Sequence, residues 1–156
     1  MLSVWDLDGT VIDSSHRHVN KPCGNIDLDH WRANSTREKI MRDRLLPLVH
    51  KMRYEERAGK LVVICTARVM TRHDREFLRV NKVPWNVIIC RDEGESTPDA
   101  EMKVSKLSKL AATIGLGDCW TKVCEMWDDN DKVIAAMKAI GVKINDAKTL
   151  NYARSH

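Results

Sequence analysis

Two aspartates stand one residue apart directly after the first apolar run of the chain. The run at 2–5 has the character of a short buried strand, and Asp6, Asp8, Gly9 and Thr10 follow it. Side chains alternate along an extended chain, so Asp6 and Asp8 are expected to point the same way. Two carboxylates so close repel each other unless a cation lies between them. The spacing therefore predicts a metal-ion site to which both aspartates contribute.

Five short apolar runs predict the strands of a sheet. Segments of helical periodicity lie between them, and strands alternating with helices predict an α/β fold. We expect a doubly wound, Rossmann-like parallel sheet with helices on both faces. A polar stretch at 16–34 predicts a short cap-like insertion after the first strand, within one domain covering 1–156. The runs are at 2–5, 61–65, 87–90, 123–127 and 142–144.

Apolar periodicity predicts four helices. The clearest begins at Ser35, where the letters S-T-R-E form a capping box, and its apolar stripe continues to Met52. A second stripe ends at Gly115 and a third at Gly141, as is common because glycine tolerates the backbone conformation that follows a helix. A weaker helix is expected at 71–80.

Polar residues with reactive groups follow four of the predicted strands. In open parallel sheets, ligands bind beyond the carboxyl ends of the strands. We therefore expect these residues to converge on that edge. They are Asp6, Asp8 and Thr10 after the first run, Thr66 and Arg68 after the second, Arg91 and then Lys103 after the third, and Asp128 to Asp131 after the fourth.

This set of residues fits phosphoryl transfer. Mg²⁺ prefers oxygen ligands, which Asp6 and Asp128 or Asp129 would supply. An aspartate such as Asp6 can attack phosphorus, and Asp8 is placed to protonate the leaving alcohol. A hydroxyl and an ammonium group would hold the phosphoryl oxygens. The residues for this last task are Thr66 and Lys103.

The order of these motifs resembles that of the haloacid-dehalogenase superfamily of phosphatases. The letters D-L-D-G-T at 6–10 are the most specific part, and Thr66 at a strand end, Lys103 and the pair Asp128 and Asp129 follow in the same order. The resemblance spans nearly the whole chain. It implies Asp6 as nucleophile, Asp8 as acid and base, and Mg²⁺ as cofactor, with Asp6, Asp8, Asp128 and Asp129 as candidate metal residues.

Within that superfamily, the chain is similar to the 3′-phosphatase domain of phage polynucleotide kinase-phosphatase. The similarity rests on the first motif with Arg17 downstream, the letters T-A-R at 66–68, Arg91, a lysine at 103, and E-M-W-D-D at 125–129. It implies removal of 3′-phosphates from polynucleotide ends, in the host cytoplasm if the protein is phage-encoded. It also implies a phosphate pocket, whose candidate residues are Thr10, Arg17, Arg68 and Arg91.

The chain departs from that family in three ways. Threonine replaces serine in the second motif, which keeps the hydroxyl. The sequence has no GxxxxGK[ST] stretch, so no ATP site is expected. The segment at 16–34 is longer, and an insertion there can exclude a polynucleotide and favour a mononucleotide.

Bulk composition sets wider limits. The 156 residues are 43% hydrophobic and 31% charged, with a net charge of +4 that fits an anionic ligand without requiring one. No apolar stretch has membrane-spanning length, and no signal pattern opens the chain. The five cysteines include no CxxC, which indicates reduced cysteines and a cytoplasmic protein. The sequence does not indicate an oligomeric state.

Several alternatives stay open at this point. The partner is a phosphorylated nucleic-acid end or a nucleotide, so a (deoxy)nucleoside monophosphate phosphatase is the first alternative to the 3′-phosphatase. A phosphatase of small sugar or lipid phosphates and a non-catalytic binding module are the others. Asp128 or Asp129 could cap the following helix and leave the other to bind metal. Trp31 could stack on a base, although packing is the usual role of tryptophan.

Overall fold

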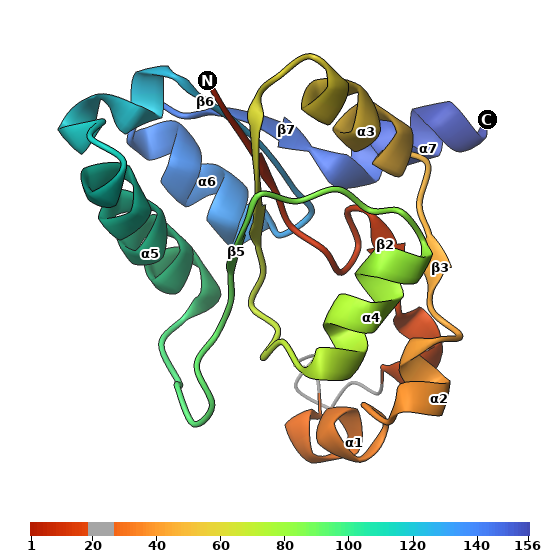
Figure 1. The fold of residues 1–156 in the computed structure, drawn as a ribbon. Helices are drawn as coiled ribbons and strands as arrows, with labels where there is room; N and C mark the ends of the chain where they lie inside the picture. The colour runs from red at the N-terminus through yellow and green to blue at the C-terminus, as the bar shows by residue number, and fades with distance from the viewer. Residues whose placement is uncertain (19–26) are drawn as a thin grey trace.

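The computed structural model describes residues 1–18 and 27–156, and its centre is a five-stranded parallel sheet (Figure 1). The strand order is β5-β4-β1-β6-β7, and every neighbouring pair is parallel. This confirms the predicted doubly wound α/β fold. The strands are β1 (Leu2–Trp5), β4 (Leu61–Cys65), β5 (Val87–Ile89), β6 (Cys124–Asp128) and β7 (Lys143–Asp146).

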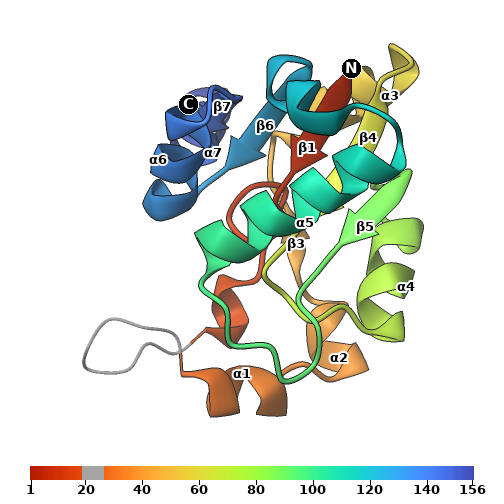
Figure 2. The same ribbon diagram turned by 90° about the vertical axis from the view of Figure 1, so that its left-hand side faces the viewer.

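Helices cover both faces of the sheet, and a separate apolar core lies under each set. Val62 and Ile64 of β4 pack in one core, whereas Val63 and Cys65 pack in the other, because successive side chains of a strand point to opposite faces. Figure 2 shows α5 lying across one face of the sheet. That face carries α5 (Asp99–Thr113) and α6 (Asp131–Ala139), and the other carries α3 (Val49–Arg57), α4 (Arg72–Val80) and α7 (Ala147–Ser155).

The predicted single helix from Ser35 to Met52 is wrong. The chain forms a short helix, α2 (Arg37–Ile40), and then β3 (Arg44–Leu45), which pairs antiparallel with β2 (Ile12–Asp13); α3 begins only at Val49. Thr36, not Ser35, caps α2 by accepting from the backbone N–H of Lys39. The break has a local cause, because a proline at 47 would clash with the carbonyl of residue 43 in a continuous helix.

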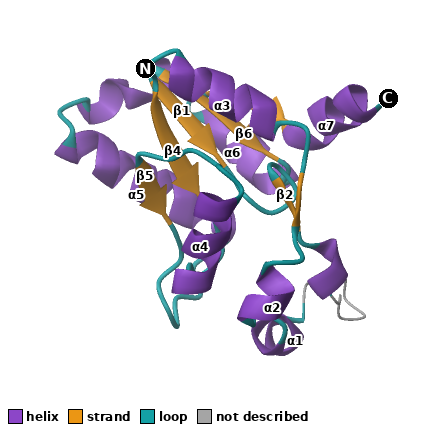
Figure 3. Cartoon of the chain, turned by 45° about the vertical axis from the view of Figure 1, so that its right-hand side comes forward, coloured by secondary structure: helices purple, strands orange, loops and turns teal. Residues whose placement is uncertain are grey.

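The predicted insertion at 16–34 lies partly outside the described residues. Its described parts are a short 3₁₀ helix, η1 (Ser15–Arg17), and α1 (Leu28–Ala33). Figure 3 shows α1 and α2 beyond the carboxyl ends of the strands. A second 3₁₀ helix, η2 (Gly117–Lys122), precedes β6. Among the described helices, none is both long and apolar enough to cross a membrane.

Candidate active site

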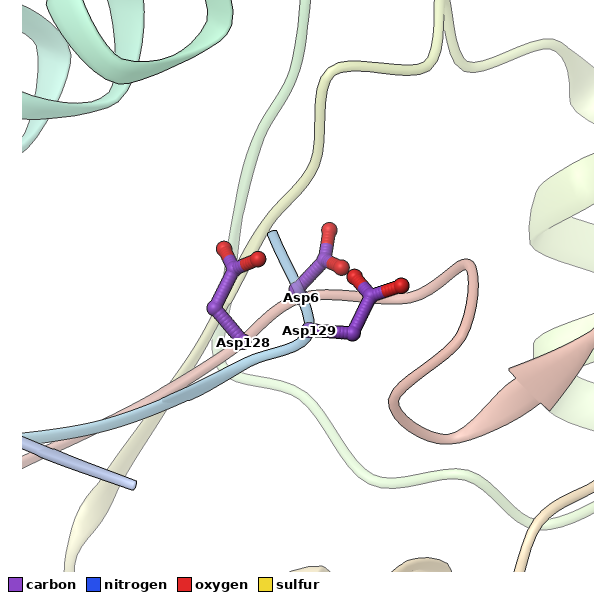
Figure 4. A group of neighbouring side chains, drawn as sticks. All are labelled: Asp6, Asp128 and Asp129. Carbon is purple, nitrogen blue, oxygen red and sulfur yellow. The ribbon is translucent and has the colours of Figure 1, made fainter. Parts of the chain in front are cut away.

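The carboxyl ends of β1 and β6 bring three aspartates together. Trp5 pairs in register with Trp127, so Asp6 and Asp128 follow at the ends of adjacent strands, and Asp129 comes next. One carboxylate oxygen from each of Asp6, Asp128 and Asp129 lies within 4.8 Å of the other two (Figure 4). Three carboxylates at this spacing form the kind of oxygen donor set that Mg²⁺ prefers.

Lys103 of α5 is the cation that partly neutralises this cluster. Its Nζ lies 3.0 Å from Oδ1 of Asp6 and 2.7 Å from Oδ2 of Asp128, and the residue is only 2% exposed. Burial lowers the pKa of the ammonium, but Asp6 and Asp128 outweigh burial and raise it, so the lysine keeps its proton. The sequence predicted this lysine from its order among the motifs. In the structure its ammonium group contacts the carboxylate of Asp6, the predicted nucleophile.

One ammonium does not balance three carboxylates, and the excess negative charge contributes to raised pKa values of Asp128 and Asp129. Burial and the neighbouring Asp6 raise the pKa of Asp128 to about 7 and that of Asp129 to about 8. The fully ionised cluster with Lys103 carries a net charge of about −2, which a divalent cation would offset. The donor set and its charge therefore fit a Mg²⁺ ion held by Asp6, Asp128 and Asp129.

A tight turn after β1 leaves room for the carboxylate of Asp129. Gly9 has φ 78°, and a β-carbon built on it would lie 2.7 Å from Cγ of Asp129 and closer still to Oδ2. The carboxylate of Asp129 thus occupies the space that a side chain at position 9 would need. Thr10 is buried in the same turn, and its hydroxyl donates to Oδ2 of Asp6 at 3.3 Å. Thr10 therefore orients the carboxylate of Asp6, the predicted nucleophile.

Asp8 lies apart from the cluster and faces a different partner. Arg68 donates to it twice, from Nη2 to Oδ1 at 2.5 Å and from Nε to Oδ2 at 3.1 Å, and the hydroxyl of Ser14 also donates to Oδ1. Burial raises the pKa of Asp8, but Arg68 outweighs burial and lowers it overall. Strand alternation does not hold here, because the strand ends at Trp5 and Asp8 sits in the turn. A place for Asp8 among the metal ligands stays a prediction.

Arg68 is held by a buried network that sequence reasoning missed. Its Nη1 donates to Asp74 at 2.6 Å, and its Nη2 lies 3.7 Å from Asp43. Arg17 donates to both carboxylate oxygens of Asp43, at 2.9 and 2.7 Å. Thr66 is buried at the end of β4, where its hydroxyl accepts from the backbone N–H of Arg68.

Two signals in the sequence could have located this network. The proline at 47 marks a break in the helix near Asp43. Thr71 and Asp74 have the spacing of a capping box, which the structure contains at the start of α4. Asp74 thus has two tasks, because one carboxylate oxygen caps the helix and the other receives Arg68.

Arg91 lies at the same edge of the sheet, but its guanidinium donates hydrogen bonds to other groups of the protein. Its guanidinium donates to the carbonyl oxygens of Ala67 and Thr97, at 3.0 and 2.7 Å, and to the carboxylate of Asp99 at 2.6 Å. These contacts tie the loop after β5 to the loop after β4, next to Arg68. Phosphate binding by Arg17, Arg68 and Arg91 stays a prediction, and in this structure all three hold protein groups.

The fold defines the class of protein. A haloacid dehalogenase-like family hydrolase from Streptococcus pneumoniae superposes with a TM-score of 0.65 at 16% identity, covering 97% of this chain and 90% of that one. A chain of the Pnkp1/Rnl/Hen1 complex superposes with a TM-score of 0.67 at 18% identity, covering 94% of this chain but only 44% of that one. At this identity both likenesses show a shared fold, that of haloacid-dehalogenase-superfamily hydrolases.

Sequence comparison places the chain within a particular family. Residues 1–155 match the family described as bacteriophage T5 5′-deoxynucleotidase. The chain is also 45% identical over 173 residues to a 5′-deoxynucleotidase of Escherichia phage T5, covering 95% of this chain and 67% of the phage protein. The chain belongs to the bacteriophage T5 5′-deoxynucleotidase family, and it is a phosphatase with the fold of haloacid-dehalogenase-superfamily hydrolases.

Proposed function

We propose that the protein is a Mg²⁺-dependent 5′-deoxynucleotidase, which hydrolyses deoxynucleoside 5′-monophosphates to deoxynucleosides and phosphate. The observation that carries the proposal is the cluster of Asp6, Lys103, Asp128 and Asp129, which lies at the carboxyl edge of the sheet with Asp8 in the adjoining turn. The activity named for the T5 relative supports a 5′-phosphate as substrate.

The chemistry follows from the two aspartates of the first motif. A carboxylate oxygen of Asp6 attacks phosphorus and forms an aspartyl-phosphate, while the bond from phosphorus to the 5′-oxygen breaks. Asp8 gives its proton to that oxygen. It then takes a proton from the water that hydrolyses the aspartyl-phosphate, which frees the Asp6 carboxylate and leaves Asp8 protonated again. A Mg²⁺ ion held by Asp6, Asp128 and Asp129 would supply positive charge to the phosphoryl oxygens.

The pair between Asp8 and Arg68 has to open before the proton is given. Arg68 keeps the Asp8 carboxylate ionised, so Asp8 has to take up a proton from solvent after the pair opens and before it can protonate the leaving oxygen. We infer that the incoming phosphate takes over donors of Arg68, since a guanidinium binds phosphate and carboxylate in the same bidentate geometry. This keeps Arg68 as the predicted substrate-binding residue, with Asp74 holding its other end.

The described part of the insertion favours a mononucleotide over a polynucleotide end. The indole of Trp31 on α1 lies 4.3 Å from Cζ of Arg17 and 5.6 Å from Cζ of Arg68. Arg68 also pairs with Asp8, so its side chain links this bulky aromatic residue to Asp8. Such a residue next to the acid narrows the approach for a long strand and offers a surface to a single nucleoside. Of the substrates left open by the sequence, we favour the deoxynucleoside 5′-monophosphate over the 3′-phosphorylated polynucleotide.

Phosphate release across a matched panel tests the proposal. The panel contains the four deoxynucleoside 5′-monophosphates, their 3′-isomers, the ribonucleotides, 2-deoxyribose 5-phosphate, and oligonucleotides phosphorylated at either end, each with Mg²⁺ and with a chelator. We expect turnover of the deoxynucleoside 5′-monophosphates that the chelator stops and that Asp6→Asn abolishes. Turnover mainly of 3′-phosphorylated oligonucleotides would overturn the proposed substrate.

A second variant tests the insertion separately. Trp31→Ala should raise KM for the nucleotides more than for 2-deoxyribose 5-phosphate, which has no base, and should leave kcat for the sugar phosphate largely unchanged. Equal effects on both substrates would remove Trp31 from nucleoside recognition without touching the assignment of the reaction.

A further inference from the structure

A groove lies on the other side of the molecule from the aspartate cluster. It is an open surface groove of about 840 Å³ that runs between α3 and the chain that leaves α4 for β5. In Figure 1 this connection passes below α3. Arg57 ends α3 shortly before β4 begins, and Lys82 follows α4 before β5. The groove therefore lies at the amino ends of the strands, opposite the edge that carries the cluster.

The floor of this α3–α4 groove is apolar and contains an aromatic ring. Leu78 and Val83 are buried at its base, and Pro84 and Trp85 are half-buried in its lining. Trp85 packs on one of the two apolar cores, so its ring is held in place. A planar group that enters the groove would contact the part of Trp85 that lines it.

The rim of the groove is cationic. Arg57, Arg79 and Lys82 are all exposed, and none of them forms an ion pair with a residue that the structure describes. Glu56 is the acidic residue in the lining. Arg53 joins the two walls, because it donates to the carbonyl oxygens of Asn81 and Lys82 at 2.8 and 3.2 Å.

Helix ends account for only part of this charge. Cations near a helix C-terminus interact favourably with the helix dipole, which explains Arg57 on α3 and Arg79 on α4. Lys82 lies beyond α4, and its φ of 54° is in the left-handed region that favours glycine or asparagine. The backbone at this position gives no reason for a lysine, whereas an anion bound in the groove does.

The positive surface continues beyond the groove. Arg79 also lines a neighbouring hollow with Arg72, His73 and Arg37, and there Glu76 pairs with Arg37 at 2.6 Å. Arg72 and Arg79 are seven residues apart on α4, which is about 10 Å along a helix. More than one phosphate of a single strand can lie along that length. Two hollows that share an arginine suit a polymer better than a single phosphate.

We propose that the α3–α4 groove binds single-stranded nucleic acid. Arg57, Arg79 and Lys82 contact the phosphates, and an unpaired base stacks on Trp85. Stacking on an aromatic residue together with basic contacts to the backbone is the general mode of sequence-tolerant single-strand binding. Because the groove is at the opposite edge of the sheet, its occupancy does not depend on the catalytic cluster, and the inference stands apart from the proposed activity.

Fluorescence anisotropy with a labelled dT12 that lacks terminal phosphates tests this, using the full chain in EDTA so that no phosphatase reaction contributes. We expect binding whose affinity falls steeply between 50 and 200 mM salt. The triple variant Arg57→Glu, Arg79→Glu, Lys82→Glu should bind at least tenfold more weakly. The single variant Arg79→Gln should bind severalfold more weakly and serves if the triple variant does not fold.

The matched control removes the same charge elsewhere. Lys109, Lys132 and Lys138 are exposed cations on α5 and α6, at the other face of the sheet. Their triple change to glutamate should alter binding by less than twofold. Equal weakening by both triple variants would mean that only net charge matters, and would overturn the groove as a site.

The stacking contact has its own readout. Trp85→Leu should weaken dT12 binding at least fivefold and should leave the affinity for inorganic polyphosphate itself unchanged, because polyphosphate has no bases. Binding of duplex DNA as tight as that of dT12, or equal dT12 affinity of the unchanged protein and Trp85→Leu, would overturn the proposed occupant. The groove variants should keep full turnover of the phosphatase substrate, which separates this test from that of the proposed function.

Discussion

Replacing Gly9 with alanine tests whether the turn after β1 exists to admit Asp129. A β-carbon at position 9 would lie 2.7 Å from Cγ of Asp129, well inside ordinary contact distance, so the carboxylate must leave its place. The positive φ of 78° adds backbone strain of about 1–2 kcal/mol for any L-residue. We expect Gly9→Ala to unfold roughly 2–8 °C lower. Its Mg²⁺ affinity should fall by about 10- to 100-fold, the scale of losses when support of a metal site is removed.

Gly59→Ala separates the two effects. Gly59 has φ 82°, and a β-carbon there would meet nothing within 4 Å. This variant should show a similar loss of thermal stability with unchanged Mg²⁺ affinity and activity. Calorimetric titration of Mg²⁺ into both variants, alongside thermal unfolding, is the assay. If Gly9→Ala bound Mg²⁺ as tightly as Gly59→Ala, the close packing of the turn against Asp129 would have no role in the metal site.

Three further perturbations follow from charges in the site. Lys103→Met should abolish turnover and lower the free energy of unfolding by roughly 3–5 kcal/mol in chelator, because it leaves Asp6 and Asp128 without their buried cation. Urea titrations, with Lys103→Arg for comparison, measure the loss of stability. Mg²⁺ affinity should rise between pH 6 and 9, since Asp128 and Asp129, with pKa values of about 7 and 8, must lose protons to bind the ion. Both values exceed the ordinary 3.8, so in chelator the contribution of these groups to stability is present at low pH and is lost as pH rises through 7 to 8; thermal unfolding with and without Mg²⁺ at each pH measures it. Asp43→Asn should destabilise the fold by roughly 3–5 kcal/mol, because Arg17 loses its buried counter-ion, whereas the exposed Asp131→Asn should change stability by less than about 1 kcal/mol in the same urea titration.

The sequence predicted the sheet well because each strand is a short apolar run that ends at a reactive residue. The predicted runs at 2–5 and 61–65 coincide with β1 and β4, and the other three strands differ by one or two residues at their ends. The aspartate cluster followed from the same signal, because parallel strands place their following residues on one edge. The order of the motifs along the chain was enough to predict that Asp6, Lys103 and Asp128 lie in one site.

The sequence did not predict which charged residues pair with one another. The apolar stripe from Ile40 to Met52 has helical spacing, yet the chain breaks within it and buries Asp43 against Arg17, 26 residues away. Arg68 was expected to face phosphate, and it holds Asp8 and Asp74. Periodicity reports which residues are buried, but it does not report which ion pairs form between distant segments. The pairs depend on how the insertion and α4 pack beyond the sheet.

The two aspartates of the first motif end in opposite electrostatic environments, and this difference separates their tasks. Asp6 shares a cluster in which carboxylates outnumber cations, so the pKa values of its neighbours rise and a divalent ion is favoured. Asp8 faces a guanidinium that lowers its pKa, which suits a base and opposes an acid. Because the proposed reaction needs Asp8 first as an acid, the arginine must exchange the carboxylate for another anion in each cycle. The substrate phosphate has the right charge and geometry for that exchange, so substrate binding would itself prepare the acid for the first step.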